Sequence, residues 1–227
     1  MPDRDVPDPR DGPVAAIRWV LRAENETVVL ARELISSALA VAIVGMVLFA
    51  VSGLWPPLVA VKSGSMTPHL NKGDLVFVAG PHRFAPANTT EGSGVITHRM
   101  GQRAGYKTFQ EPGNVIVYDR NGNAHKTPVI HRARFWVNKG ENWYGKANPQ
   151  YVGDARNCQQ LQYCPAPYSG FITKGDANSA YDQVAGISAP VKPAWVRGKA
   201  ELRIPGLGWI RLLLTGTAAL TATPVAP

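Results

Sequence analysis

The sequence predicts a mostly β fold, a β-rich domain preceded by one N-terminal transmembrane helix. Three observations support this prediction. Glycine and proline are frequent, with 22 Gly and 19 Pro among 227 residues, which favours many turns. The stretch between Glu33 and Lys62 contains no charged residue. The apolar runs after this stretch are short and are separated by turn-forming pairs such as Gly-Asp, Pro-Gly and Asn-Gly.

The uncharged stretch contains Leu34–Trp55, which as a helix would be about 33 Å long and would cross a hydrocarbon core of about 30 Å. Pro56 and Pro57 then end the helix. A buried core helix rarely runs this far without a charge. A cleaved secretory signal starts earlier, has a shorter apolar run and precedes a small-residue cleavage site. We therefore interpret the segment as a signal anchor in a cell membrane.

Charge is distributed unevenly about this segment. Residues 1–33 carry five Arg and seven acidic residues, whereas residues 62–227 carry 19 Lys and Arg against nine acidic residues. A strongly basic domain suits nucleic acid or an anionic membrane surface. The arginines just before the segment slightly favour a cytoplasmic N-terminus under the positive-inside rule. Most basic residues then lie outside the cell, which argues against nucleic acid as a partner.

These features divide the chain into four parts. Residues 1–33 form a cytoplasmic segment, predicted to be disordered to residue 13 and then to form an interfacial helix over 14–33. Residues 34–55 form the anchor, and residues 56–206 an extracytoplasmic β-rich domain with a loop insertion at about 140–169. Residues 207–227 form an apolar tail, for which a return to the membrane surface, packing on the domain and a second span all stay open.

Four runs in the β-rich domain have the length and composition of strands. They are Leu75–Val78, Val115–Tyr118, Val129–Val137 and Gly170–Thr173. The second and third are expected to pair as an extended hairpin, because Arg120-Asn121-Gly122-Asn123 suits a tight turn between them. Two stretches, residues 80–113 and 140–169, are expected to be rich in loops.

The first candidate for chemistry is the run Lys62-Ser63-Gly64-Ser65-Met66-Thr67-Pro68, shortly after the anchor. A serine hydroxyl is a weak nucleophile unless a base takes its proton, and it needs donors for the developing oxyanion. Ser-Gly-Ser supplies one serine as nucleophile and another as donor, with a glycine that lets a substrate approach the backbone closely. Taken alone, the tripeptide is also typical of a linker.

A histidine and two aspartates complete the set of candidates. His131 lies inside an apolar strand and can point to the opposite face from Ile130, as a general base or as an ordinary strand histidine. Asp176 and Asp182 follow the last predicted strand. Either carboxylate could orient the histidine and stabilise its cation, or simply belong to a polar turn.

Together these motifs resemble signal peptidase I over roughly residues 30–215. The resemblance rests on S-G-S-M-x-P after an anchor, I-H-R in a strand, and K-G-D with a second Asp six residues on. His131 occupies the position of the bacterial lysine base, which resembles the archaeal and endoplasmic-reticulum branch. Segments such as GENWYGKANPQYVG and LGWIRL are most similar to haloarchaeal members. The implied fold is a signal-peptidase-like antiparallel β-domain with an N-terminal transmembrane helix.

The resemblance implies a role for each motif residue. Ser65 would be the nucleophile and His131 the general base. Asp182 would be the triad acid and Asp176 a supporting acid, although which of the two aspartates is the triad acid stays open. Ser63 Oγ and the Ser65 backbone N–H would form the oxyanion hole. Met66 and Pro68 would shape the site without taking part in the chemistry. The family often has Asn directly after the first Asp, where this chain has Ala177.

The implied activity is that of a membrane-bound serine endopeptidase that removes signal peptides from translocated preproteins after small residues. Its partners would be secretory preproteins, membrane lipid and the translocation machinery, and it would need no cofactor or metal. A catalytically silent anchored β-domain of a cell-surface or secretion assembly is the alternative. A protease that cleaves itself or one regulatory partner is a third reading, but Ala60-Val61-Lys62 is a poor site for self-cleavage.

The remaining histidines lack metal-binding spacing, and we expect them to be solvated in loops. They are His69, His82, His98 and His125. Cys158 and Cys164 lie six residues apart in a proline-containing loop. An external compartment permits a disulfide between them, and two free thiols are the alternative.

Overall fold

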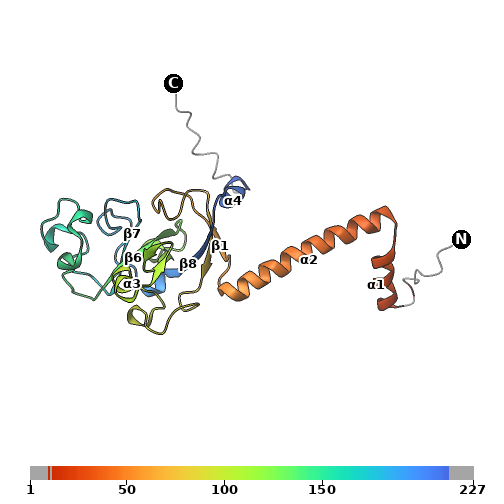
Figure 1. Ribbon diagram of the computed structural model, residues 1–227, viewed down its shortest axis with the longest axis horizontal. Coiled ribbons are helices and arrows are strands. Elements are labelled where there is room, and N and C mark those ends of the chain that lie inside the picture. Colours follow the sequence, from red (N-terminus) through yellow and green to blue (C-terminus); the bar gives the residue numbers. More distant parts are fainter. Residues whose placement is uncertain (1–9, 11, 215–227) are drawn as a thin grey trace, which may run out of the picture. The chain divides into compact units, whose positions relative to one another are not determined.

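The computed structural model describes residues 10 and 12–214, so the predictions for residues 1–9, 11 and 215–227 lie outside the described residues. The chain divides into two compact units, Met1–Ala50 and Val51–Pro227. Each unit is described by itself (Figure 1).

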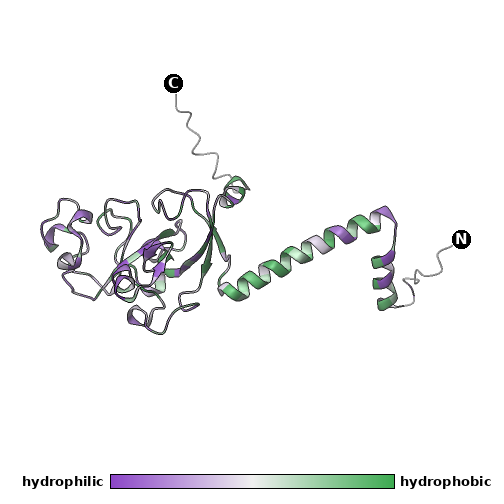
Figure 2. Ribbon diagram, viewed as in Figure 1, coloured by the Kyte–Doolittle hydropathy of each residue, from purple (hydrophilic) through white to green (hydrophobic). Residues whose placement is uncertain are grey.

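The first unit consists of helix α1 (Pro13–Arg22) and most of helix α2 (Glu26–Ser52). α2 is long and apolar enough to cross a membrane, with a mean hydropathy of 2.6 over its most apolar stretch (Figure 2). It starts and ends earlier than the predicted Leu34–Trp55. The Asn25 side chain accepts a hydrogen bond from the Thr27 N–H at its start, and Gly53, with φ of 71°, follows its last residue.

The predicted interfacial helix over residues 14–33 is wrong in its extent. α1 ends at Arg22, and residues 26–33 belong to α2. The charged residues Arg32 and Glu33 do not interrupt a helix, because both side chains are good helix formers. α1 alone is amphipathic, with Val14, Ile17 and Leu21 exposed along one side.

The second unit is built on a six-stranded sheet in the order β1-β2-β8-β5-β6-β7, in which every neighbouring pair is antiparallel. The strands are β1 (Leu58–Ala60), β2 (Leu75–Ala79), β5 (Val115–Tyr118), β6 (Val129–Val137), β7 (Gly170–Lys174) and β8 (Val196–Ile204). β3 (Lys107–Thr108) and β4 (Glu111–Pro112) pair with each other as a separate two-stranded sheet. A mostly antiparallel β fold with one long apolar N-terminal helix is therefore confirmed.

The helices of the second unit are short. They are α3 (His98–Ala104), α4 (Gly208–Leu214) and the 3-10 turns η1 (Thr90–Gly92), η2 (Arg120–Gly122), η3 (Tyr144–Lys146), η4 (Pro149–Tyr151), η5 (Cys158–Gln160) and η6 (Pro193–Trp195). α3 lies within the stretch 80–113, which was expected to be rich in loops. Its N-cap, Thr97, accepts a hydrogen bond from the Met100 N–H.

The four predicted strands are all present, and the predicted hairpin is confirmed. β5 pairs with β6 through Val115↔Arg132 to Tyr118↔Val129, around the turn η2. β1 and β8 were not expected. β8 lies in the middle of the sheet but contains Lys199, Glu201 and Arg203. These charged residues break the apolar pattern by which a strand is recognised in the sequence.

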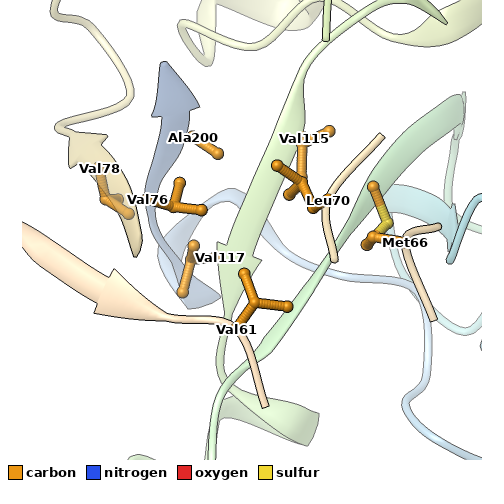
Figure 3. Close-up of a cluster of buried hydrophobic side chains, with 8 residues drawn as sticks. All are labelled: Val61, Met66, Leu70, Val76, Val78, Val115, Val117 and Ala200. Carbon is orange, nitrogen blue, oxygen red and sulfur yellow. The ribbon is translucent and has the colours of Figure 1, made fainter. Parts of the chain in front are cut away.

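The sheet has a hydrophobic core on each face. Val115 and Val117 of β5 belong to one cluster, and Ile116 and Tyr118 belong to the other, as strand alternation requires. The first cluster consists of Val61, Met66, Leu70, Val76, Val78, Val115, Val117 and Ala200 (Figure 3). It includes Met66, which directly follows the candidate nucleophile Ser65, and Leu70. These two side chains anchor the Ser65 segment in the core.

The predicted insertion at residues 140–169 packs against β6 and β7. Its buried side chains, Trp143, Val152 and Leu161 among them, join Phe135 and Ile172 in a third cluster. Cys158 and Cys164 are joined by a disulfide within it. The insertion is thus an ordered layer over one end of the sheet.

Candidate active site

The Ser-Gly-Ser segment forms a tight turn directly after β1. Thr67 closes this turn, since both its N–H and its hydroxyl donate to the Gly64 carbonyl, at 3.1 and 2.8 Å. Met66 and Leu70 are fully buried on the β5 side of the core (Figure 3). The buried neighbours fix the turn, while Ser63 stays exposed and Ser65 is half-buried.

Ser65, His131 and Asp182 form one hydrogen-bonded series. His131 Nε2 lies 2.9 Å from Ser65 Oγ, and His131 Nδ1 lies 2.8 Å from both carboxylate oxygens of Asp182. Because a carboxylate accepts the Nδ1 proton, the neutral ring presents an unprotonated Nε2 to the serine hydroxyl. His131 is 4% exposed and Asp182 is 0% exposed, so water reaches the series only from the serine end.

Strand register places the histidine. His131 lies opposite Ile116 in β5, on the sheet face that carries the second hydrophobic cluster. Asp182 reaches this face from the loop after β7, where its N–H donates to the Thr173 carbonyl at 2.9 Å. Two residues far apart in the sequence are thereby joined, and His131 links Asp182 to Ser65.

Asp182 has a second side-chain partner that the sequence did not suggest. The Tyr118 hydroxyl donates to Asp182 Oδ2 at 2.8 Å, and Thr173 Oγ1 donates to the Tyr118 oxygen at 3.3 Å. Burial raises the pKa of Tyr118 well above its ordinary value, and the nearby Asp182 carboxylate raises it further. The phenol therefore stays protonated and holds the carboxylate in place.

Asp176 lies outside this hydrogen-bonded series, and its role as a supporting acid stays a prediction. Arg132 Nε donates to its Oδ1 at 2.9 Å and Arg132 Nη2 to its Oδ2 at 2.7 Å. His69 Nδ1 lies 2.9 Å from the same Oδ2. Burial would raise the pKa of Asp176, but the hydrogen bonds and charge of Arg132, assisted by His69, lower it below its ordinary value. The geometry thus distinguishes the two aspartates.

Asp176 instead belongs to a loop that holds the nucleophile turn. The Ala177 N–H donates to the Ser65 carbonyl at 2.9 Å, and the Asp176 N–H donates to Met66 Sδ at 3.4 Å. The bond to Ser65 uses the Ala177 backbone, so it does not need the side chain that the family often has there. A Cβ on Gly175 would lie 2.6 Å from the Ser65 carbonyl oxygen, so only glycine allows this approach.

Two buried cations support the same loop. The Lys174 ammonium donates to the carbonyl oxygens of Gly175 and Asn178 at 2.8 and 2.6 Å. The Arg132 guanidinium donates to the carbonyls of Thr108 and Gly113 as well as to the aspartate. The loop is therefore tied to β6 and β7, and the nucleophile turn is tied to the loop.

The residues implied for the oxyanion hole lie at the exposed end of the series. Ser63 Oγ lies 3.2 Å from Ser65 Oγ. Among the residues that the structure describes, the Ser65 backbone N–H has no acceptor. Both groups are therefore free to donate to an oxygen that develops beside the nucleophile.

The other histidines divide into two kinds. His82 and His125 are exposed, as expected. His69 and His98 are not solvated loop residues: His69 contacts Asp176, and His98 starts α3 and is half-buried. Burial, with the charge of nearby arginines, lowers the pKa of His98 to about 4. Within residues 10 and 12–214, no three His, Cys, Asp or Glu side chains form a metal-binding group.

No model of a known protein family matches this chain, and no curated protein matches it. Its function must therefore be inferred from the residues and their geometry.

Proposed function

We propose that this protein is a membrane-bound serine endopeptidase of the signal peptidase I type, which removes signal peptides from translocated preproteins. The observation that carries the proposal is the series Ser65–His131–Asp182, at 2.9 and 2.8 Å, in a unit that starts at the end of a long apolar helix. A serine, an imidazole and a buried carboxylate in this order are the arrangement of serine proteases on several unrelated folds.

The chemistry is acyl transfer. Ser65 Oγ bonds to the carbonyl carbon of the last signal-peptide residue while its proton passes to His131 Nε2. The new oxyanion accepts hydrogen bonds from the Ser65 N–H and the Ser63 hydroxyl. The C–N bond then breaks, and the proton on His131 leaves with the amine of the mature protein. Water attacks the acyl-enzyme, gives a proton to His131 and releases the signal-peptide carboxylate, after which Ser65 regains its proton.

The buried carboxylate makes the proton transfer possible. The imidazolium that forms on His131 is stabilised by Asp182, which the Tyr118 hydroxyl holds in place. Since Asp182 is fully buried, its charge acts in a medium of low dielectric constant and is felt more strongly than in water. The geometry therefore favours Asp182 as the acid of the triad.

The position of the nucleophile supports the substrate class. Ser65 lies thirteen residues after Ser52, the last residue of α2. In the proposed topology the N-terminus is cytoplasmic, and the active site lies close to the outer face of the membrane. A translocating preprotein presents its cleavage site there, after small residues at positions −1 and −3. The proposed partners are secretory preproteins, membrane lipid and the translocation machinery.

The test is cleavage of a secretory preprotein by the full-length protein in proteoliposomes. The wild type is compared with Ser65→Ala and with Ser179→Ala, which removes an exposed serine of the loop that carries Asp182. We expect the wild type and Ser179→Ala to cleave after a small residue, as N-terminal sequencing of the product shows, and Ser65→Ala to leave the preprotein intact. Equal cleavage by all three would remove Ser65 as nucleophile. No cleavage by any of them would favour the silent anchored domain.

A further inference from the structure

The segment that carries the nucleophile ends its turn at His69, four residues after Ser65. The His69 N–H donates to the Met66 carbonyl at 3.0 Å, and the His69 side chain is only 15% exposed. His69 Nδ1 lies 2.9 Å from Asp176 Oδ2. Because an ionised carboxylate only accepts hydrogen bonds, the proton of this bond is on Nδ1. The second unit thus contains an aspartate–histidine pair outside the triad.

This pair and two further hydrogen bonds attach the nucleophile segment to the loop after β7. The Ala177 N–H donates to the Ser65 carbonyl at 2.9 Å, and the Asp176 N–H donates to Met66 Sδ at 3.4 Å. His69 supplies the third attachment, at the other end of the segment. Two consecutive residues of the loop therefore hold the segment at both ends. Of the three bonds, only that of His69 joins two side chains, so a substitution can remove it and leave the backbone bonds in place.

The His69 ring borders a small cavity. The cavity has a volume of about 110 Å³ and is lined by Pro68, His69, Phe109, Gln110 and Arg203. Arg203 Nη1 donates to the His69 carbonyl at 2.8 Å, and this bond holds the backbone but not the ring. A side chain beside a cavity lacks packing contacts on that side. The bond to Asp176 therefore sets the orientation of the ring.

Asp176 is itself fixed to the strand that carries the general base. Arg132, which directly follows His131 in β6, is fully buried and donates to both carboxylate oxygens of Asp176 at 2.9 and 2.7 Å. Its guanidinium also donates to the Gly113 carbonyl at 2.9 Å, which fixes it independently of the loop. The series Arg132–Asp176–His69 thus connects β6 to the end of the nucleophile segment by a path that does not pass through the triad.

We propose that His69 is a positioning residue, which through Asp176 holds Ser65 Oγ within hydrogen-bonding distance of His131 Nε2. This role rests on the proposed function, because it concerns the same nucleophile. His69 takes no part in the proton transfer. Without its bond, the end of the segment is free to move relative to β6, and the distance of 2.9 Å between nucleophile and base lengthens. A displacement of about 1 Å at a site lowers the rate by about a hundredfold.

The test compares preprotein cleavage by the full-length wild type, His69→Leu and His69→Asn in proteoliposomes. Leucine removes the hydrogen-bond donor, whereas the amide of asparagine places an N–H close to the position of Nδ1 and can keep the bond to Asp176. His125→Leu, the same change at an exposed histidine, is the matched control. Circular dichroism and thermal unfolding show whether each variant is folded at the assay temperature.

We expect His69→Leu to lower kcat by about ten- to a hundredfold and to leave KM unchanged, because the substrate contacts remain while the transition state loses its geometry. His69→Asn should recover most of the wild-type kcat, and His125→Leu should equal the wild type. A merely structural role would lower the folded fraction and would not change kcat of the folded protein.

An unchanged kcat in His69→Leu would overturn the proposal. An equal loss in His69→Leu and His69→Asn would also overturn it, because the hydrogen bond to Asp176 would then not be the cause. A higher KM at unchanged kcat would mean that His69 contacts the substrate instead.

A second assay separates this proposal from the proposed function. Hydrolysis of p-nitrophenyl acetate needs an activated serine but no preprotein, and the part due to Ser65 is the part lost on adding Ser65→Ala. If the wild type has this activity and leaves preproteins intact, the preprotein function fails, and the ester rates of the His69 variants decide the positioning role. If the wild type has no ester activity due to Ser65 and cleaves no preprotein, the triad fails and the role of His69 fails with it.

Discussion

The Tyr118 hydroxyl donates a hydrogen bond of 2.8 Å to Oδ2 of Asp182, and both residues are fully buried. This bond leaves the carboxylate with its other interactions directed at His131. A phenol therefore holds the acid end of the Ser65–His131–Asp182 series. Its pKa is raised, so it keeps its proton throughout the physiological pH range.

Removal of this donor should slow catalysis without unfolding the domain. A hydrogen bond to a charged group contributes about 1.5–3 kcal/mol, and loss of part of this in the transition state corresponds to a rate about tenfold lower. We expect Tyr118→Phe to lower kcat by about that factor, because Asp182 can then turn away from His131. Preprotein cleavage at saturating substrate measures it, with Tyr168→Phe as the control outside this network. An unchanged kcat would show that Tyr118 is not needed to hold the carboxylate.

Gly175→Ala should reduce activity far more than an alanine in open space. The new Cβ would meet the Ser65 carbonyl oxygen at 2.6 Å, so the loop and the nucleophile turn must separate. Gly145 has no neighbour within 4 Å of its Cβ position, so Gly145→Ala is the matched control. We expect a loss of about a hundredfold or more for Gly175→Ala, since displacements of about 1 Å at a site have effects of this size. Equal rates for the two variants would contradict this role of the loop.

The Asp176–Arg132 pair should make stability depend on pH on the acid side. The pKa of Asp176 is lowered in the folded state, so its stabilisation is fully present above the unfolded pKa of about 4 and is lost as the pH falls through the folded pKa. At pH 7, Asp176→Asn should cost about 3–5 kcal/mol, because it leaves the Arg132 guanidinium buried without its counter-ion.

Denaturant unfolding of both proteins in the same detergent, from pH 7 to pH 3, measures this effect. The difference between wild type and Asp176→Asn should shrink as the pH falls below 4. A difference that stays constant over this range would mean that the carboxylate is not the titrating group.

Two natural glycosylation sequons offer a test of orientation. Asn25-Glu26-Thr27 lies just before α2, and Asn88-Thr89-Thr90 lies in the second unit, with both asparagines exposed. Translation into microsomes that carry an oligosaccharyl transferase should give one glycan, lost in Asn88→Gln and kept in Asn25→Gln. The glycan should reside on Asn88 because the second unit is proposed to be outside. A glycan on Asn25 alone would reverse the proposed topology.

Much of the fold follows from local patterns in the sequence. The strands of the hairpin, Val115–Tyr118 and Val129–Val137, are apolar runs on either side of a turn signal, and the structure has them with the predicted bounds. β8 was missed because Lys199 and Glu201 lie in its middle. Lys199 is 0% exposed and its ammonium lies 3.5 Å from a Glu201 oxygen. No local rule predicts a buried lysine in a central strand.

The candidate site was predictable in its residue types but not in its pairings. Ser65 and His131 stand in distinctive motifs, and the structure brings them together. The choice between Asp176 and Asp182 depends on the path of the loop after β7, which the sequence does not determine. The sequence shows Tyr118 only as the last residue of an apolar strand. Its hydroxyl finds a partner only because the fold brings Asp182 beside it.

The most direct test of the triad is whether Ser65 and Asp182 act as one unit. The rate of preprotein cleavage is measured in matched proteoliposomes for the wild type, Ser65→Ala, Asp182→Asn and the double variant. We predict that each single change lowers the rate by several orders of magnitude, and that Asp182→Asn has no further effect once Ser65 is alanine. Substantial cleavage by Ser65→Ala, or a full additional loss in the double variant, would contradict the triad.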